Sequence, residues 1–528
     1  MIAYLNAALR GGLALALLTL SSIAHAEWWE AETSHFIIVS ESPKVEVEAF
    51  ATRLERFDNA LRFMQGLPIP GPDIGRSNKV SVYRFGDIDD IGQLFGDGGS
   101  RVAGFYIPRA GAAVSFVPAI ENRGDRLSRN LDERQRNKKT GMTSEGILFH
   151  EYVHHFMLQK FSTAYPHWYV EGFAELYGTL ELLDGGAFRV GDVPQHRGAA
   201  LFDLPSIRLT RLFDHKKRLN GMEYYQSYSF GWMLAHYLNF DKERQGQLAQ
   251  YLQALNAGED SLTAANKAFG DLDKLQRELG KYQKGPFPTI TIKPTNYVAP
   301  KVDIRRLTPA EAAVIKAHIR TQRGVTKRQA RSVANDVSGE ETKYPDSLAV
   351  QLITGEAYVD AQDFAKAEAA LKRALVLDPR SEDAHILMGG LFMSRAKEEK
   401  NAALYTTARR SFSEAYRLDP KDPRAAIGYY MSYYEAKAPI PEPAIIALES
   451  VFEYSSYDNG YRLILARQFL DENNGDLARS VLAPLAFSGH KQEKANKIAG
   501  IVANIDANDI PAARAAMAAI FAEADNED

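Results

Sequence analysis

The sequence has 528 residues, which is enough for more than one domain and for a sizeable core. Hydrophobic residues make up 45% and charged residues 25%, as in ordinary globular proteins, and the formal net charge of −4 excludes the strong basicity of a general nucleic-acid binder. The chain contains no cysteine, which excludes disulfides, a thiol nucleophile and a cysteine zinc site.

The N-terminus has the pattern of an export signal. Arg10 precedes an apolar stretch over 13–20, and the small residues Ala24 and Ala26 follow. The apolar stretch is shorter than the ~20 residues that span a bilayer, so we expect residues 1–26 to be a signal peptide cleaved after Ala26. The mature protein is then expected in an extracytoplasmic space, without a stable membrane span. That space is the periplasm in a Gram-negative host and the exterior otherwise.

The next part of the chain alternates between strand and helix patterns. Strands are predicted at 35–40, 79–85, 102–108 and 112–118, and helices at 47–64 and 87–96. A charged connection follows at 121–141, and the chain is expected to be mainly helical from 143 to 280. We therefore predict an α+β unit over residues 27–283.

A proline-bearing segment at 284–307 breaks the helical periodicity and is predicted to be an interdomain linker. Beyond it, over residues 308–528, the chain is rich in alanine and in helical periodicity. Leu-Asp-Pro triplets begin at Leu377 and Leu418, and a repeat of about 34 residues with an insertion at 396–402 accounts for their separation. This pattern resembles a tetratricopeptide array, which implies an all-α solenoid that binds a protein partner. An unrelated helical bundle is the alternative.

The stretch "ILFHEYVHHFMLQKF" places ionisable groups within an apolar helical run. His150, Glu151 and His154 fit the pattern H-E-x-x-H, which projects both imidazoles from one helix face, close enough to share a metal ion. This arrangement suits a zinc ion that lowers the pKa of a bound water to about 7, with Glu151 as general base. The alternative is a buried histidine pair satisfied by other polar groups. His155 is interpreted as structural or as a support for a ligand.

A catalytic zinc site usually has a third protein ligand. Downstream, "HWYVEGFAELYG" offers Glu171, provided that this second helix folds back on the first, and Glu175 on the same face is the competing ligand. His167 is interpreted, like His155, as structural or supporting. If Glu171 binds the metal, we expect Glu175 to hold a histidine N–H beside it.

H-E-x-x-H followed by W-x-x-E-G-x-A-E resembles the gluzincin clan of zinc metallopeptidases, and is most similar to the aminopeptidase N-type signature. The resemblance implies a zincin-like fold with zinc held by His150, His154 and Glu171. It also implies a tyrosine near the substrate carbonyl, for which Tyr225 aligns best and Tyr228 is the alternative; core-facing aromatics are the other interpretation of both. The Gly-x-Met-Glu-Asn motif that binds a free amino terminus in those aminopeptidases is not found, which favours an endopeptidase.

The same clan pairs an extended substrate with an edge strand of its sheet, and residues 104–116 are the candidate here. We therefore predict an exported zinc peptidase that acts on peptide or protein substrates. The alternative is a non-catalytic tetratricopeptide scaffold with a structural or vestigial zinc site, although such a site needs no general base at Glu151. The repeats are expected to recruit a protein without contributing to catalysis, so that residues 27–290 alone would bind zinc and cleave short peptides.

Overall fold

The computed structural model describes residues 27–96, 102–120, 143–161, 163, 165–214, 219–295, 297–486 and 492–527. The predicted signal peptide and the whole predicted 121–141 connection lie outside this part of the chain. None of the described helices is long and apolar enough to cross a membrane.

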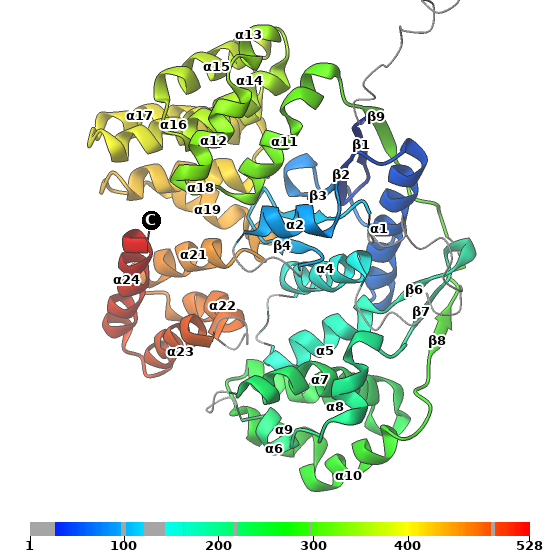
Figure 1. The fold of residues 1–528 in the computed structure, drawn as a ribbon. Helices are drawn as coiled ribbons and strands as arrows, with labels where there is room; N and C mark the ends of the chain where they lie inside the picture. Colours follow the sequence, from blue (N-terminus) through cyan, green and yellow to red (C-terminus); the bar gives the residue numbers. More distant parts are fainter. Residues whose placement is uncertain are drawn as a thin grey trace, which may run out of the picture.

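A six-stranded sheet forms the centre of the N-terminal part (Figure 1). Its strands, in spatial order, are β4 Phe105–Ile107, β5 Val114–Val117, β3 Val80–Arg84, β2 Phe36–Ser40, β1 Trp29–Glu32 and β9 Asp303–Arg306. Of the four inner strands, β2, β3 and β5 run parallel to one another, and the other pairings are antiparallel. Three of the four strands predicted from sequence thus lie inside the sheet. The fourth, β4, lies at its edge.

Helices cover both faces of this sheet. Phe36 and Ile38 of β2 point to the face covered by α1 Lys44–Met64 and α4 Ser144–Lys160. Ile37 and Val39 point to the opposite face, which α2 Ile88–Phe95 and α11 Pro309–Arg323 cover. Burial on both sides explains why β2 reads as an uninterrupted apolar run instead of an alternating one.

A helical lobe follows α4 (Figure 1). Its helices are α5 His167–Gly178, α6 Leu209–Leu212, α7 Gly221–Phe240, α8 Gln247–Asn256, α9 Ser261–Phe269 and α10 Leu272–Tyr282. The mainly helical character expected over 143–280 is confirmed. The sequence analysis did not anticipate a small antiparallel sheet beside this lobe, formed by β6 Glu181–Leu182, β7 Phe188–Val190 and β8 Ile290–Ile292.

The segment 284–307 differs from the linker that its prolines suggested. It contributes β8 to the small sheet, where Ile292 pairs with Phe188, and β9 to the large one, where Ile304 pairs with Ala31. The helix that follows, α11, buries Ile315 and Ile319 in the core of the large sheet. The N-terminal unit therefore includes residues as far along the chain as α11.

The rest of the chain consists of helices stacked in pairs into an arc (Figure 1). They are α12 Lys327–Val337, α13 Glu340–Lys343, α14 Leu348–Asp360, α15 Phe364–Leu377, α16 Glu382–Glu398, α17 Ala403–Leu418, α18 Pro423–Tyr434, α19 Glu442–Ser450, α20 Phe452–Ser455, α21 Asn459–Asp471, α22 Gly475–Ala486, α23 Gln492–Asp506 and α24 Ile510–Glu527.

The Leu-Asp-Pro triplets mark helix ends, since α15 ends at Leu377 and α17 at Leu418. Small residues lie where helices cross: a Cβ added to Gly389 or Gly428 would come within 2.7 or 2.4 Å of the ring of Phe412. An α+β unit followed by an all-helical, solenoid-like region is thus confirmed. Its assignment to the zincin and tetratricopeptide folds stays a prediction.

Candidate metal centre

Helix α4 presents His150 and His154 on the side that faces away from the sheet. The Thr143 hydroxyl accepts a hydrogen bond from the N–H of Gly146 and caps the helix start, and Tyr152 and Phe156 pack into the main core. His150 and His154, one turn apart, lie instead against α5. Both histidines therefore face the helix that carries Glu171.

The predicted ligands converge. The Nε2 atoms of His150 and His154 are 3.1 Å apart, and Oε2 of Glu171 lies 3.4 Å from the first and 3.5 Å from the second. A zinc ion bound at its usual distances with tetrahedral angles holds its ligand atoms about 3.4 Å apart. The three atoms therefore have the spacing of three corners of a zinc tetrahedron, and two histidines with one glutamate are a donor set that suits zinc.

Burial and charge also favour a cation at this point. The Glu171 side chain is 0% exposed, and a buried carboxylate is costly unless a positive partner compensates it. Burial by itself would lower the pKa of His154, but the charges of Glu171, Glu151 and Glu175 outweigh this effect and raise it. The surroundings of the imidazoles are thus strongly negative.

Glu175 lies beside the three converging atoms and not among them. Its Oε1 lies 3.9 Å from Nδ1 of His150 and accepts a hydrogen bond of 2.7 Å from Nε of Arg197. Its Oε2 lies 2.9 Å from Nε2 of His196. Burial would raise the pKa of Glu175, but the hydrogen bond from His196 and the nearby charges of His150, Arg197 and His196 lower it to about 2. Glu175 is therefore an anion beside His150, but its distance of 3.9 Å from Nδ1 of His150 is longer than a hydrogen bond, so the expected hydrogen bond from His150 to Glu175 is not formed.

Arg197 and His196 were not identified from sequence. They belong to a short turn at Gln195–Arg197, in an irregular segment between β7 and α6. Such a segment has no apolar periodicity that would reveal which side chains point inward. The only signal in the sequence was that an arginine and a histidine, both able to donate hydrogen bonds to a carboxylate, stand next to each other.

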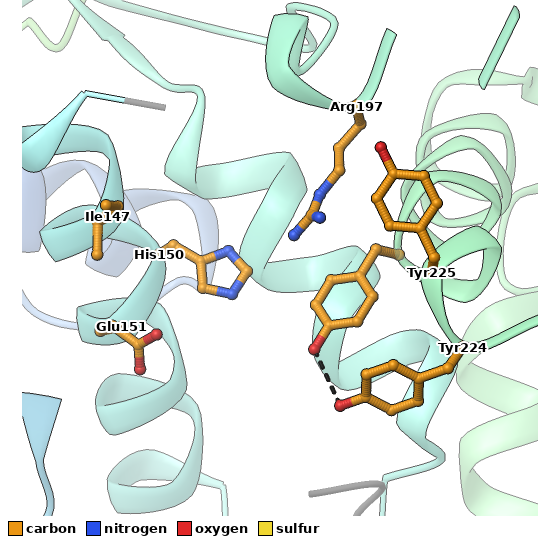
Figure 2. Close-up of a pocket in the computed structure, with 7 residues that line it drawn as sticks. Ile147, His150, Glu151, Arg197, Tyr224 and Tyr225 are labelled. Carbon is orange, nitrogen blue, oxygen red and sulfur yellow. Dashed lines mark hydrogen bonds between the residues drawn. The ribbon is translucent and has the colours of Figure 1, made fainter. Parts of the chain in front are cut away.

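An open pocket of about 390 Å³ adjoins the histidines, lined by Ile147, His150, Glu151, Arg197, Tyr224, Tyr225 and Tyr228. Figure 2 shows His150 and Glu151 projecting from α4 towards the tyrosines of α7 across this space. Glu151 is thus placed on the pocket side of the converging ligands, where a base would meet a substrate.

The two candidate tyrosines differ in their surroundings. Tyr225 is 38% exposed. Tyr228 is only partly exposed; its hydroxyl is 3.1 Å from that of Tyr224, and the guanidinium of Arg197 lies 4.4 Å from its ring centroid. Burial and the nearby charge of Glu171 raise the pKa of Tyr228, which keeps its phenol protonated and able to donate. The geometry favours the alternative, Tyr228.

The other histidines of α4 and α5, His155 and His167, are not among the three converging side chains. His167 stacks on Tyr224 with ring centroids 5.0 Å apart, and its Nε2 is 3.2 Å from the hydroxyl of Ser227. His155 points to the opposite side of α4, where its Nδ1 is 2.7 Å from the hydroxyl of Tyr106 on the edge strand β4. Burial and the charges of Lys160 and His35 lower the pKa of His155 to about 3, so its ring is neutral.

Two glycines allow α5 to approach α7 closely. A Cβ on Gly172 would lie 2.4 Å from the carbonyl oxygen of Gly231, and one on Gly231 would lie 2.3 Å from that of Trp168. The glycine after Glu171 in the "EGFAE" stretch is therefore required by this helix crossing. The crossing sets the position from which Glu171 reaches the histidines.

No family model matches the sequence, and no curated protein matches it. Among solved structures, the chain is similar to one described as "Functional Characterization of Pseudomonas Aeruginosa pilF", with a TM-score of 0.31 and 18% sequence identity. The alignment covers 39% of this chain and 88% of that chain. At this TM-score the likeness carries no argument about fold or function.

Proposed function

We propose that the chain is a zinc-dependent peptidase of gluzincin type, most suited to internal peptide bonds. The observation that carries the proposal is the triangle of His150 Nε2, His154 Nε2 and Glu171 Oε2, with edges of 3.1, 3.4 and 3.5 Å, beside a pocket that also contains Glu151. A structural zinc site is closed by a fourth protein ligand, whereas a catalytic one faces an open position. The pocket beside His150 supports the catalytic kind.

In this proposal, a bound zinc ion supplies Lewis-acid activation of a water molecule and of the scissile carbonyl. Glu151 takes a proton from the attacking water as the new C–O bond forms. It then gives that proton to the nitrogen of the breaking C–N bond, which leaves as an amine. The phenol of Tyr228 donates a hydrogen bond to the developing oxyanion. Glu175 orients Arg197, from which it accepts a hydrogen bond.

The helix that lines one side of the pocket, α4, contacts the edge strand β4. Among the described strands, only β5 pairs with β4, and we propose that the other side of β4 accepts an extended peptide. Addition of a substrate strand to such an edge would bring a peptide alongside the metal-binding helix. We accordingly propose a peptide or protein substrate, with Phe105–Ile107 as the part of the predicted 104–116 segment that binds it.

The proposal also covers the C-terminal helices and the location of the protein. The helical pairs are proposed to be tetratricopeptide repeats with a protein partner. The mature enzyme is proposed to act outside the cytoplasm after removal of the signal-like residues 1–26, in the periplasm of a Gram-negative host or secreted otherwise.

Metal analysis and a peptide-library digest of the chain that begins at residue 27 test the proposal. We expect about one zinc per chain, loss of that zinc in His150→Ala and His154→Ala, and no loss in the control His385→Ala, whose histidine lies on α16. Glu151→Gln should keep the metal and lose hydrolysis. A wild-type chain that does not retain zinc, or a Glu151→Gln variant with wild-type turnover, would refute the proposal. A zinc-loaded wild type that cleaves nothing would favour the scaffold alternative.

A further inference from the structure

The helical repeats contact the rear of the metal-binding helix. Tyr457, which follows α20, is 1% exposed and packs in the core of the N-terminal unit and not in that of the repeats. Its ring centroid lies 4.2 Å from that of His155, the residue that follows the proposed ligand His154. A side chain some 300 positions away in the sequence thus forms part of the packing behind the metal site.

The same region of the repeats completes the end of α4. The last carbonyls of a helix have no partner within it. The hydroxyl of Ser456 donates a hydrogen bond of 3.0 Å to the carbonyl of Leu158, in the last turn of α4. The repeats therefore provide both a side-chain contact and a C-terminal cap to the helix that carries the histidines.

The N-terminal unit also inserts a residue into the repeats, at the tip of the β4–β5 hairpin. Ala110 of this tip packs in the core of the repeats and is 5% exposed. Its N–H donates a hydrogen bond of 2.8 Å to Asp458, and the hydroxyl of Tyr457 donates one of 3.4 Å to the carbonyl of Arg109. The guanidinium of Arg109 in turn donates to the carbonyl of Gln322 on α11. The chain's own hairpin therefore occupies this part of the repeats.

These contacts meet at His155. On one side, its Nδ1 is 2.7 Å from the hydroxyl of Tyr106, on the edge strand proposed to bind substrate. On the other side, its ring contacts Tyr457 of the repeats. His155 is thus held between the sheet edge and the repeats, and its backbone is continuous with that of His154.

We infer that the repeats position the metal-binding helix, and that Tyr457 is a positioning residue that acts through His155. This inference rests on the proposed metal site and replaces the division of labour expected from sequence, in which the repeats took no part in the site. Groups that orient metal ligands from behind commonly contribute 10- to 100-fold to metal affinity.

The test compares Tyr457→Ala with Tyr457→Phe in the full chain from residue 27. Tyr457→Ala removes the ring from His155 and should weaken Zn²⁺ binding about ten-fold in chelator competition. It should also change the d–d absorption of the Co²⁺-loaded chain, which reports the ligand geometry. Tyr457→Phe keeps the ring and should restore both the affinity and the spectrum.

Tyr358→Ala is the matched control, because Tyr358 is also 1% exposed but packs within a separate cluster of the first repeats. It should destabilise the repeats and leave Zn²⁺ affinity and the Co²⁺ spectrum unchanged. If Tyr457→Ala does not fold, Tyr457→Leu, which keeps most of the apolar volume, takes its place. Equal affinities in the Tyr457 and Tyr358 variants would overturn the inference. A wild-type chain that binds neither metal would instead overturn the proposed function.

Discussion

A methyl group added at Gly172 should separate the two helices that position Glu171. The new Cβ would lie 2.4 Å from the carbonyl oxygen and 2.5 Å from the carbonyl carbon of Gly231, both backbone atoms of α7. Ordinary contact needs about 1 Å more, and backbone atoms cannot move aside by rotating a side chain. Overpacking of this kind costs about 1–3 kcal/mol, of which the better helix propensity of alanine offsets about 1 kcal/mol.

Gly280→Ala provides the matched control within the same lobe. Gly280 also lies in a helix, α10, but a Cβ there would meet no atom within 4 Å. It should therefore stabilise the chain by up to about 1 kcal/mol, so that the two variants differ by about 2 kcal/mol in the free energy of unfolding. Urea titrations of the metal-free chains measure this difference, and chelator competition measures zinc affinity, which should fall only in Gly172→Ala. Two variants of equal stability and equal zinc affinity would refute the argument from the helix crossing.

Three further substitutions test the site and its surroundings. Glu171→Gln should lower zinc affinity by more than about 100-fold and Glu175→Gln by only about 10-fold in chelator competition; the reverse order would make Glu175 the ligand. Tyr228→Phe should lower kcat for a cleaved peptide about 100-fold, whereas Tyr225→Phe should leave kcat near the wild-type value. Equal effects of the two substitutions would refute the assignment of Tyr228 as the donor to the oxyanion. Burial lowers the pKa of His236 to about 4, whereas an unfolded histidine titrates near 6.5. The free energy of unfolding should therefore fall by up to about 3 kcal/mol as the pH drops from about 6.5 to 4, and His236→Gln should lack this component in urea titrations across that range.

The ligand triangle was predictable because its determinants are local. A spacing of four residues in a helix brings His150 and His154 to one face, whatever the rest of the fold does. The prediction of Glu171 required one assumption about the tertiary structure, that α5 folds back on α4. The resemblance of the sequence around Glu171 to the W-x-x-E-G-x-A-E signature suggested that assumption. Tyr225 and Tyr228 show the limit of such reasoning, because three residues along a helix change the direction of a side chain. Only tertiary features, the exposure of each ring and its contacts with Tyr224 and Arg197, distinguish the two.

What the sequence did not reveal depends on contacts between distant segments. Tyr457 reads as one more aromatic residue of a helical repeat, and nothing near it in the sequence indicates that it leaves that core for another. Segment 284–307 contains the alternation Thr-Ile-Thr-Ile at 289–292, which is a strand pattern, but its prolines suggested a linker. Short edge strands such as β8 and β9 form only because β7 and β1 offer them unpaired edges.

These distant contacts reverse the expectation that residues 27–290 form a sufficient enzyme. A fragment ending at 290 lacks β9 and also Leu307, Ile315 and Ile319, which pack on the second face of the sheet. Each such side chain contributes about 1.5–3 kcal/mol when buried, so their combined loss approaches the total stability of a typical domain. We expect this fragment to show no cooperative urea transition. A fragment of residues 27–326 should regain the transition, because it restores this core, yet bind zinc more weakly than the full chain, because it lacks Tyr457. Cooperative unfolding of the shorter fragment with full zinc affinity would contradict both steps of this argument.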